Sequence, residues 1–321
     1  MDLSLTELHV HVGSAVDPAV MWSIAHSQGI RLPTKNYWDF VDLITVGTRV
    51  KTFDDYLALF HWTELIQSSP EAMERSVYEI IGGAYRHNNI ERLELRFNPM
   101  KRNRGGERDL DHIIAAAIRG MERAQLEYPV RAGLIVCLDK AFDYELNEIM
   151  VDKALAWAQR GICGIDLAGP EAPTFDFSQY APLFQRARAG GLGITVHAGE
   201  SGTLEAMRSA IETLRPTRIG HGVKAARDPA LLALLREREI LLEVCPTSNL
   251  HTGVIKDVDE LTWTLRTFVD QGIRFSINTD GPEMLQRTLR EELEWLHASG
   301  ILSVAEILQA NQWAAAYSFL R

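Results

Sequence analysis

The chain has 321 residues, with 33 Lys and Arg, 43 Asp and Glu, and a formal net charge of −10. Hydrophobic residues make up 46% and charged residues 24%, a globular profile that excludes a disordered chain, a collagen-like fibre and a small disulfide scaffold. Without a basic cluster or an apolar run of roughly 18 residues, neither a nucleic acid nor a membrane is expected as a partner. The N-terminus shows no secretion signal and the cysteines form no CxxC pair, so we expect a cytoplasmic protein.

Short apolar runs rich in β-branched residues recur along the chain, and each is followed by a segment of helical periodicity. The runs are residues 7–12, 91–97, 131–138, 163–167, 193–198, 218–221, 241–245 and 274–279. Such strands, separated by helices, are typical of a parallel sheet covered by helices. Units of about 40 residues predict an α/β fold, a (β/α)₈ TIM barrel forming one domain over residues 1–321. A doubly wound open sheet is the alternative, but it would not space its strands so evenly.

The first connection of the predicted barrel is much longer than the others. Residues 13–90 separate the first strand from the second, and they include the amphipathic segment 53–65. Loops after barrel strands emerge at the C-terminal face, where active sites lie, so we expect a helical lid here. One helical face is predicted by the i, i+3, i+4, i+7 spacing of Phe53, Tyr56, Leu57 and Phe60. Padding of the barrel exterior and ordinary core packing are the alternatives.

Residues able to bind a metal stand at the ends of several predicted strands. His9 and His11 end the first strand, where residues i and i+2 project to the same side. His197 ends the fifth strand and Asp280 follows the eighth. Three imidazoles and one carboxylate suit a single Zn²⁺ ion, with water completing the shell. The fourth strand contains no lysine that would bridge a second metal, so we predict one zinc ion per chain.

Two further polar residues complete a catalytic set with Asp280. His221 lies between two glycines after the sixth strand and is placed to orient a water molecule and take its proton. Glu200 follows His197 by three residues; enclosed by a lid, it would stay protonated and donate to a ring nitrogen. This set predicts hydrolytic replacement of an amine on an aromatic heterocycle. The phosphate loop, the dinucleotide fingerprint, HExxH and GxSxG are all absent from the sequence.

The motifs resemble those of the adenosine deaminase family within the metal-dependent amidohydrolase superfamily. The matching segments, in family order from residue 7 to 282, are ELHVHV, ERLELRFNP, GIDLAGPE, TVHAGE, RIGHG, EVCPTSN and SINTDGP. The resemblance implies a single metal-dependent hydrolase domain that binds one zinc ion through His9, His11, His197 and Asp280. It also implies that Glu200 donates a proton to purine N1 and that His221 orients and deprotonates the water.

The resemblance extends to substrate-binding and supporting residues. It implies that Gly169 offers a backbone contact to the purine and that Asp166 braces the end of the fourth strand. Ser248 and Asn249, in the PTSN segment, would support the end of the seventh strand. The apolar lid over the base would carry Phe53, Tyr56, Leu57 and Phe60.

Three positions depart from the family pattern. Gly281 stands where a second aspartate usually holds purine N7. The usual sugar-contacting carboxylate after HxH is replaced by Ser14 or Gly13, depending on the alignment. Asn98 stands where a smaller hydroxyl residue is common. Losing a charge-assisted hydrogen bond at Gly281 would cost about 1.5–3 kcal/mol of discrimination for adenosine.

The sequence therefore predicts zinc-dependent deamination of a 6-aminopurine nucleoside, giving an inosine-like product and ammonia. Adenosine is the default small-molecule substrate; 6-aminodeoxyfutalosine, a modified adenosine or a free aminopurine base are alternatives, as is hydrolysis of another C–N bond. A non-catalytic nucleoside- or protein-binding paralogue and a deaminase acting on nucleic acid are further alternatives. Zinc, iron and manganese, the sugar preference and the oligomeric state stay open at this point.

Overall fold

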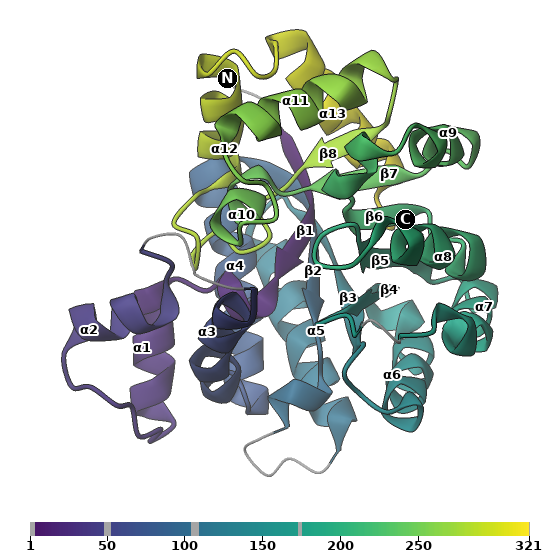
Figure 1. Ribbon diagram of the computed structural model, residues 1–321. Coiled ribbons are helices and arrows are strands. Elements are labelled where there is room, and N and C mark those ends of the chain that lie inside the picture. Colours follow the sequence, from purple (N-terminus) through teal and green to yellow (C-terminus); the bar gives the residue numbers. More distant parts are fainter. Residues whose placement is uncertain (1–3, 48–52, 104–108, 173–174, 321) are drawn as a thin grey trace.

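A ring of parallel strands forms the centre of the computed structural model, which describes residues 4–47, 53–103, 109–172 and 175–320 (Figure 1). The strands pair in sequence order, each with the next along the chain. Their bounds are β1 Leu5–His11, β2 Ile90–Phe97, β3 Arg131–Asp139, β4 Ile162–Ala168, β5 Gly193–Ala198, β6 Arg218–His221, β7 Leu241–Val244 and β8 Phe275–Ile277. This arrangement confirms the predicted (β/α)₈ barrel.

Two backbone hydrogen bonds bring β1 next to the segment after β8, so that the barrel is nearly closed. The Asp280 amide donates to the His9 carbonyl (3.0 Å), and the His11 amide donates to the Asp280 carbonyl (2.9 Å). β8 is shorter than predicted because it ends at Ile277 and the chain turns at Asp280, whose φ is 67°. Residues expected to share a metal ion therefore lie on adjoining segments of backbone.

Helices surround the strand ring (Figure 1). Their bounds are α4 Pro70–Asn88, α5 Leu110–Glu127, α6 Tyr144–Ala156, α7 Ala181–Ala189, α8 Leu204–Leu214, α9 Pro229–Glu237, α10 Pro246–His251, α11 Val258–Asp270, α12 Leu289–Ala298 and α13 Val304–Tyr317. Short 3₁₀ turns are η1 Val12–Ser14, η2 Met100–Arg102, η3 Ala158–Arg160, η4 Phe177–Tyr180 and η5 Val223–Arg227. Local sequence sets the helix ends: Ser69 caps α4 just before Pro70, and Thr288 forms a capping box with Glu291 at α12. Of the described helices, none combines the length and the hydropathy that a membrane span requires.

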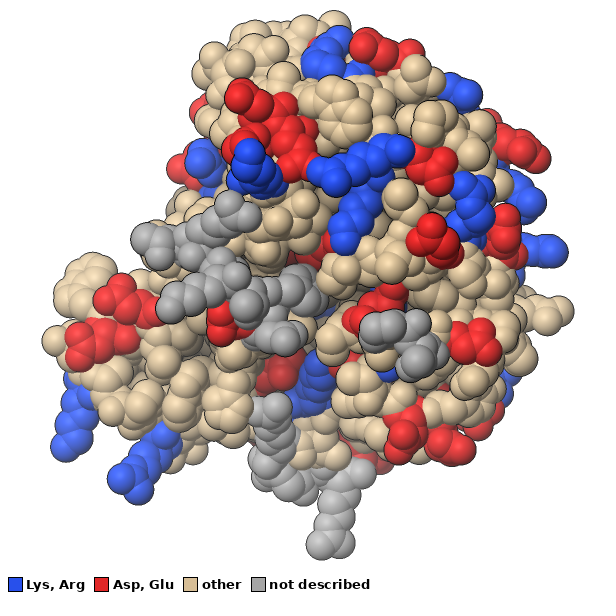
Figure 2. All heavy atoms as spheres, in the orientation of Figure 1, with Lys and Arg blue, Asp and Glu red and all other residues tan. Residues whose placement is uncertain are grey.

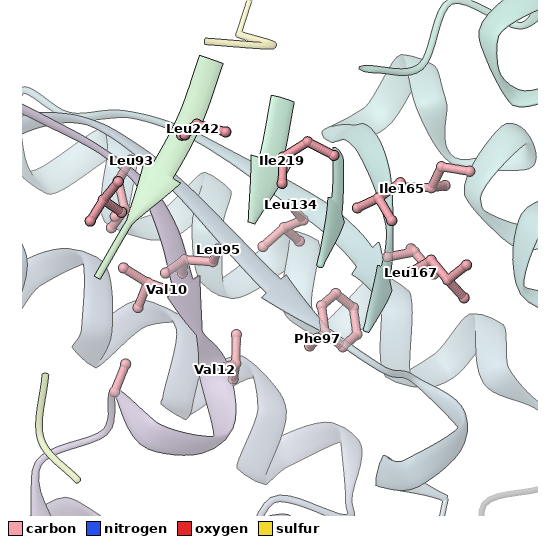
Figure 3. Packing of buried hydrophobic residues seen from close by; sticks show 14 of the residues in the cluster. Val10, Val12, Leu93, Leu95, Phe97, Leu134, Ile165, Leu167, Ile219 and Leu242 are labelled. Atoms are coloured by element: carbon pink, nitrogen blue, oxygen red, sulfur yellow. The ribbon is translucent and has the colours of Figure 1, made fainter. Parts of the chain in front are cut away.

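Apolar side chains from the strands and the surrounding helices form one large buried cluster. Val10, Leu95, Leu134, Ile165 and Leu242 come from five different strands and are each 1% exposed or less (Figure 3). Burial on both faces explains why these strands read as nearly continuous apolar runs rather than as alternating ones. Some of the polar residues that interrupt the runs, among them Arg96 and Glu243, are fully buried as well.

The long first connection folds into helices α1 Pro18–Ser27, α2 Tyr37–Ile44 and α3 Phe53–Ile66, followed by α4. In Figure 1, α1, α2 and α3 project from one side of the barrel. Helix α3 is the part that reaches the barrel centre, because Tyr56, Leu57 and Phe60 line the cavity there. A helical insertion is therefore present, whereas its action as a moving lid stays a prediction.

A buried acid on α12 makes the stability of the fold depend on pH. Glu292 accepts hydrogen bonds from the backbone amide (3.0 Å) and the hydroxyl (2.5 Å) of Thr247 at the start of α10. Burial raises the pKa of Glu292 from 4.5 to about 7, although the bonds from Thr247 and the nearby Arg287 oppose this shift. A raised pKa in the folded state gives stability that is complete below pH 4.5 and is lost as the pH rises through about 7.

The free energy of unfolding of the wild type should fall by up to about 3 kcal/mol across this pH range as Glu292 ionises. We expect Glu292→Gln, which stays uncharged, to lack this fall. Urea unfolding at several pH values measures this difference. Glu294→Gln, at an exposed position on the same helix, is the matched control. Stability curves that run parallel for the wild type and Glu292→Gln would show that Glu292 does not titrate in this range.

Candidate active site

Four side chains meet where β1, β5 and the segment after β8 come together. The Nε2 atoms of His11 and His197 lie 3.2 Å apart. Asp280 Oδ1 lies 3.4 Å from His11 Nε2 and 3.6 Å from His9 Nε2. Two sets of possible ligand atoms each lie within 4.8 Å of one another. One set comes from His9, His11 and Asp280, and the other from His9, His197 and His221. We call His9, His11, His197 and Asp280 the metal-ligand group.

The other ring nitrogen of two of these histidines faces a buried carboxylate. His9 Nδ1 lies 2.8 Å from Glu243 Oε2, and His197 Nδ1 lies 2.9 Å from Asp166 Oδ2. Each carboxylate holds the proton on Nδ1, so the Nε2 lone pair points toward the site. Among the described residues, His9 Nε2 has no hydrogen-bond partner although it is buried. Converging lone pairs and a carboxylate oxygen repel one another unless a cation lies between them, and so this group fits a divalent metal ion.

Charged residues beneath the metal-ligand group hold these carboxylates in place. Arg96 donates to Asp166 (2.9 Å) and to Glu243 (2.7 Å), and Arg218 Nε lies 2.7 Å from Glu243. Burial opposes ionisation of Asp166 and Glu243, but the neighbouring cations and imidazoles hold the pKa of both well below the usual range. The sequence analysis did not single out Arg96, Arg218 or Glu243. Their position as charged residues inside apolar strands was the sequence feature that could have identified them.

Asp280 is oriented by hydroxyl groups from two other elements. Ser248 Oγ donates to Asp280 Oδ2 at 2.6 Å, and the Tyr56 hydroxyl of α3 donates to the same oxygen at 3.3 Å. Burial disfavours the charged form of Asp280 and would raise its pKa. The neighbouring His9 and His11 outweigh this effect and hold the pKa of Asp280 well below its usual range. Asp280 and His221 also take left-handed backbone conformations, with φ of 67° and 60°. Such conformations are costly for non-glycine residues and are concentrated at functional sites.

Glu200 and His221 lie together beside the metal-ligand group. Glu200 Oε2 is 3.6 Å from His221 Nε2, and the Asn249 side-chain amide lies 3.1 Å from His221 Nδ1. Burial, together with the negative charge of Asp280, raises the pKa of Glu200 to about 8. Burial also lowers the pKa of His221 well below its usual value. At neutral pH this pair therefore consists of a protonated acid and an uncharged imidazole.

Lys140, which the sequence analysis did not identify, ties together the loops beside this pair. Its Nζ donates to Glu171 Oε2 (2.6 Å) and to the backbone carbonyl of His197 (2.8 Å). Both side chains of the ion pair are at most 5% exposed. Lys140 follows β3, Glu171 follows β4, and His197 lies near the end of β5. The lysine therefore links the C-terminal ends of three neighbouring strands.

A cavity of about 920 Å³, part of it open to solvent, lies over these groups. Its walls include Tyr56, Leu57 and Phe60 of α3 and Gly169 after β4. At Gly169 φ is +90°, and a Cβ there would lie 2.5 Å from Asp139 Oδ1, so the position requires glycine. The side chain of Phe53, also expected to bind substrate, lies outside the described residues.

Two of the residues expected at the substrate pack against each other instead of lining the described cavity wall. Ser14 and Gly281 are buried, and a Cβ at Gly281 would lie 2.6 Å from Ser14 Oγ. Ser14 Oγ donates to the backbone carbonyls of His11 (3.1 Å) and Asp280 (3.3 Å). Gly13, the alternative position for the sugar contact, does line the cavity. A carboxylate at position 281 would therefore collide with Ser14.

The comparisons with known proteins agree with this geometry. The family model described as adenosine deaminase matches residues 4–321. An adenosine deaminase from Enterococcus faecalis is 31% identical over 98% of this chain and 91% of its own length. One from Shewanella denitrificans is 30% identical over 99% of this chain and 95% of its own. An adenine deaminase from Arthrobacter aurescens shares the fold, with a TM-score of 0.88, 21% identity and coverage of 99% and 94% of the two chains. The chain thus belongs to the adenosine deaminase family and is a metal-dependent hydrolytic deaminase.

Proposed function

We propose that the protein is a zinc-dependent deaminase of a 6-aminopurine nucleoside, with adenosine as the default substrate. The reaction consumes water and replaces the ring amine by oxygen, which gives an inosine-like product and ammonia. The observation that carries the proposal is the meeting of three imidazole nitrogens and Asp280 next to Glu200 and His221. The proposed enzyme occupies residues 1–321 as one domain and works in the cytoplasm.

The metal-ligand group is proposed to hold one zinc ion. Imidazole and carboxylate ligands suit zinc, and the Nδ1 bonds to Asp166 and Glu243 orient two of the imidazoles for it. When bound, zinc lowers the pKa of water to near 7 and so supplies hydroxide at neutral pH.

Glu200 and His221 are proposed to move the protons of the reaction, and His221 also orients the attacking water beside Asp280. Glu200 carries a proton at neutral pH and donates it to the ring nitrogen next to the reacting carbon, which makes that carbon more electrophilic. His221 is uncharged and so is able to accept a proton from the attacking water. Asn249 Nδ2 lies 3.1 Å from His221 Nδ1. A flip of this side-chain amide would present its oxygen to Nδ1 instead, which would hold a proton there and leave Nε2 free for this task.

The apolar wall of α3 is proposed to cover the base. Tyr56, Leu57 and Phe60 offer a flat hydrophobic surface, and the backbone at Gly169 offers a polar contact to the purine. Ser14 occupies the space that a side chain at position 281 would need, so no carboxylate faces purine N7 from this position. The two residues therefore affect specificity. This packing favours a second candidate within the same chemistry: an aminopurine other than adenosine, such as 6-aminodeoxyfutalosine or a free base.

Ammonia release from a panel of nucleosides, free bases and non-purine amines tests the proposed reaction. We expect 6-aminopurines to be deaminated and Glu200→Gln to lower kcat by about 10²- to 10⁴-fold, because the amide N–H is too weak an acid to transfer its proton. Glu205→Gln, at an exposed position on α8, is the matched control and should keep full activity. Full activity of Glu200→Gln, or turnover of non-purine amines alone, would refute the assignment.

Metal analysis tests the proposed ligands. We expect about one zinc ion per chain, loss of activity on chelation, and a lower melting temperature of the metal-free protein because bound ligand stabilises the folded state. His197→Ala should lose most of the bound zinc, whereas the exposed His87→Ala should keep it. Unchanged zinc content in His197→Ala would contradict this ligand set, and stronger reactivation by iron or manganese would contradict zinc as the ion.

A further inference from the structure

One wall of the cavity carries nitrogen donors that the described residues leave without acceptors. Asn98 follows β2, and its Oδ1 accepts a hydrogen bond from the Lys101 amide (3.0 Å), which fixes the side chain. Within the described chain, Asn98 Nδ2 and the Nε and Nη1 atoms of Arg102 have no hydrogen-bond partner. Asn98 is 7% and Arg102 2% exposed, and both line the cavity. Buried donors of this kind normally have a partner, and here the cavity is the place for one.

Among the described residues, the partner of the Arg102 guanidinium is Glu64 of α3. Nη1 lies 3.0 Å from Glu64 Oε1, close enough for an ion pair, but its N–H direction does not make a hydrogen bond. A guanidinium has five N–H donors arranged to bind a planar oxyanion through two parallel bonds. Glu64 therefore balances the charge of Arg102 and leaves donors available to a ligand.

Gly13 makes room for this guanidinium at the end of β1. A Cβ at position 13 would lie 3.0 Å from Arg102 Nη2 and 2.9 Å from Phe60 Cδ1. Arg102 thus occupies the side of the cavity to which a side chain at position 13 would point. In the family resemblance, position 13 or 14 carries a sugar-contacting carboxylate. Here position 13 has no negative group, and the Arg102 guanidinium, paired with Glu64, fills the space, so the substrate meets N–H donors where a carboxylate is usual.

This wall lies across the barrel from the proton-transferring groups. In the eight-stranded ring, β2 is four strands away from β6, which carries His221. A substrate with its reacting ring at Glu200 and His221 would place its opposite end beside Asn98 and Arg102. Of the other cations that line the cavity, Lys101 is 2.5 Å from Asp139 and Arg96 donates to Asp166 and Glu243, whereas Arg102 Nε and Nη1 have no hydrogen-bond partner among the described residues.

We propose that Asn98 and Arg102 form a subsite for an oxyanion on the non-reacting end of the substrate. The preferred substrate would then be a 6-aminopurine nucleoside that carries a carboxylate or a phosphate at this end. The proposal deepens the proposed function and rests on it for the placement of the purine. A carboxylate or phosphate accepts hydrogen bonds without needing to donate any, which matches a wall whose unpaired atoms are all N–H donors.

The test compares adenosine, adenosine 5′-carboxylate and adenosine 5′-monophosphate as substrates. We expect at least one of the anionic compounds to exceed adenosine in kcat/KM by about tenfold or more, and the two anionic arms distinguish carboxylate from phosphate. Arg102→Gln should reduce this preference by about 10- to 100-fold, chiefly through KM. Arg102→Lys, which keeps the charge but loses the planar fork, should retain part of it. Arg238→Gln, which removes an exposed arginine at the end of α9, is the matched control and should leave the preference unchanged.

Binding measurements separate this subsite from the deaminase assignment. Calorimetry with inosine and inosine 5′-carboxylate should show tighter binding of the anion, and Arg102→Gln should remove that difference. The double variant Arg102→Gln/Glu64→Gln, checked by thermal unfolding, keeps the pair uncharged if the single variant is unstable. Equal kcat/KM for all three substrates, or an equal loss for all three in Arg102→Gln, would overturn the subsite while the proposed deamination stands. If no aminopurine is deaminated, the proposed function fails, and the calorimetric difference then decides the subsite by itself.

Discussion

Arg96 is the residue on which the geometry of the metal-ligand group depends. Its guanidinium is fully buried near the end of β2 and donates hydrogen bonds to Asp166 of β4 and Glu243 of β7. Asp166 in turn orients His197 of β5, and Glu243 orients His9 of β1. One cation thus positions side chains from four other strands. Losing Arg96 would leave Asp166 without this cation and Glu243 with Arg218 as its remaining cation, and so would loosen the hold on both imidazoles at once. The orientation of the metal ligands is therefore decided below the site, inside the barrel.

The same electrostatics explain why neighbouring carboxyl groups differ in protonation. Asp166, Glu243 and Asp280 are as deeply buried as Glu200, but cations and imidazoles close to them outweigh the cost of burial and keep them charged. Around Glu200, burial and the charge of Asp280 act in the same direction, and Lys140 and Lys224 compensate only in part. Environments that push the pKa values of nearby acids apart are how one site provides both charged ligands and a proton donor. On the face shown in Figure 2, Lys and Arg lie among Asp and Glu.

The sequence predicts the barrel well because both-face burial leaves a clear signal in each strand, and it predicts the metal-ligand group because histidines at strand ends are conspicuous in apolar runs. It does not reveal Arg96 and Glu243 as partners, since pairing between β2 and β7 depends on the closed ring and not on any local pattern. The left-handed backbone at Asp280 and His221 is likewise imposed by tertiary contacts. Whether Ser14 or Gly13 faces the cavity also needed coordinates, because the two positions differ by only one residue.

The two glycines that depart from the family pattern have a common physical consequence. At Gly281 the missing side chain is replaced by Ser14, and at Gly13 by Phe60 and Arg102. In each case a neighbour fills the space, so restoring a carboxylate by a single substitution would require that neighbour to move, Ser14 at position 281 and Phe60 at position 13. Under the proposed function, recognition would therefore be altered by residues that pack against each other on loops beyond the strand ends. His221 ends β6, whereas Glu200 and Asp280 lie just beyond β5 and β8. Under the proposed function these groups keep the deamination chemistry, while a change at Gly13 or Gly281 alters only what the rest of the cavity binds.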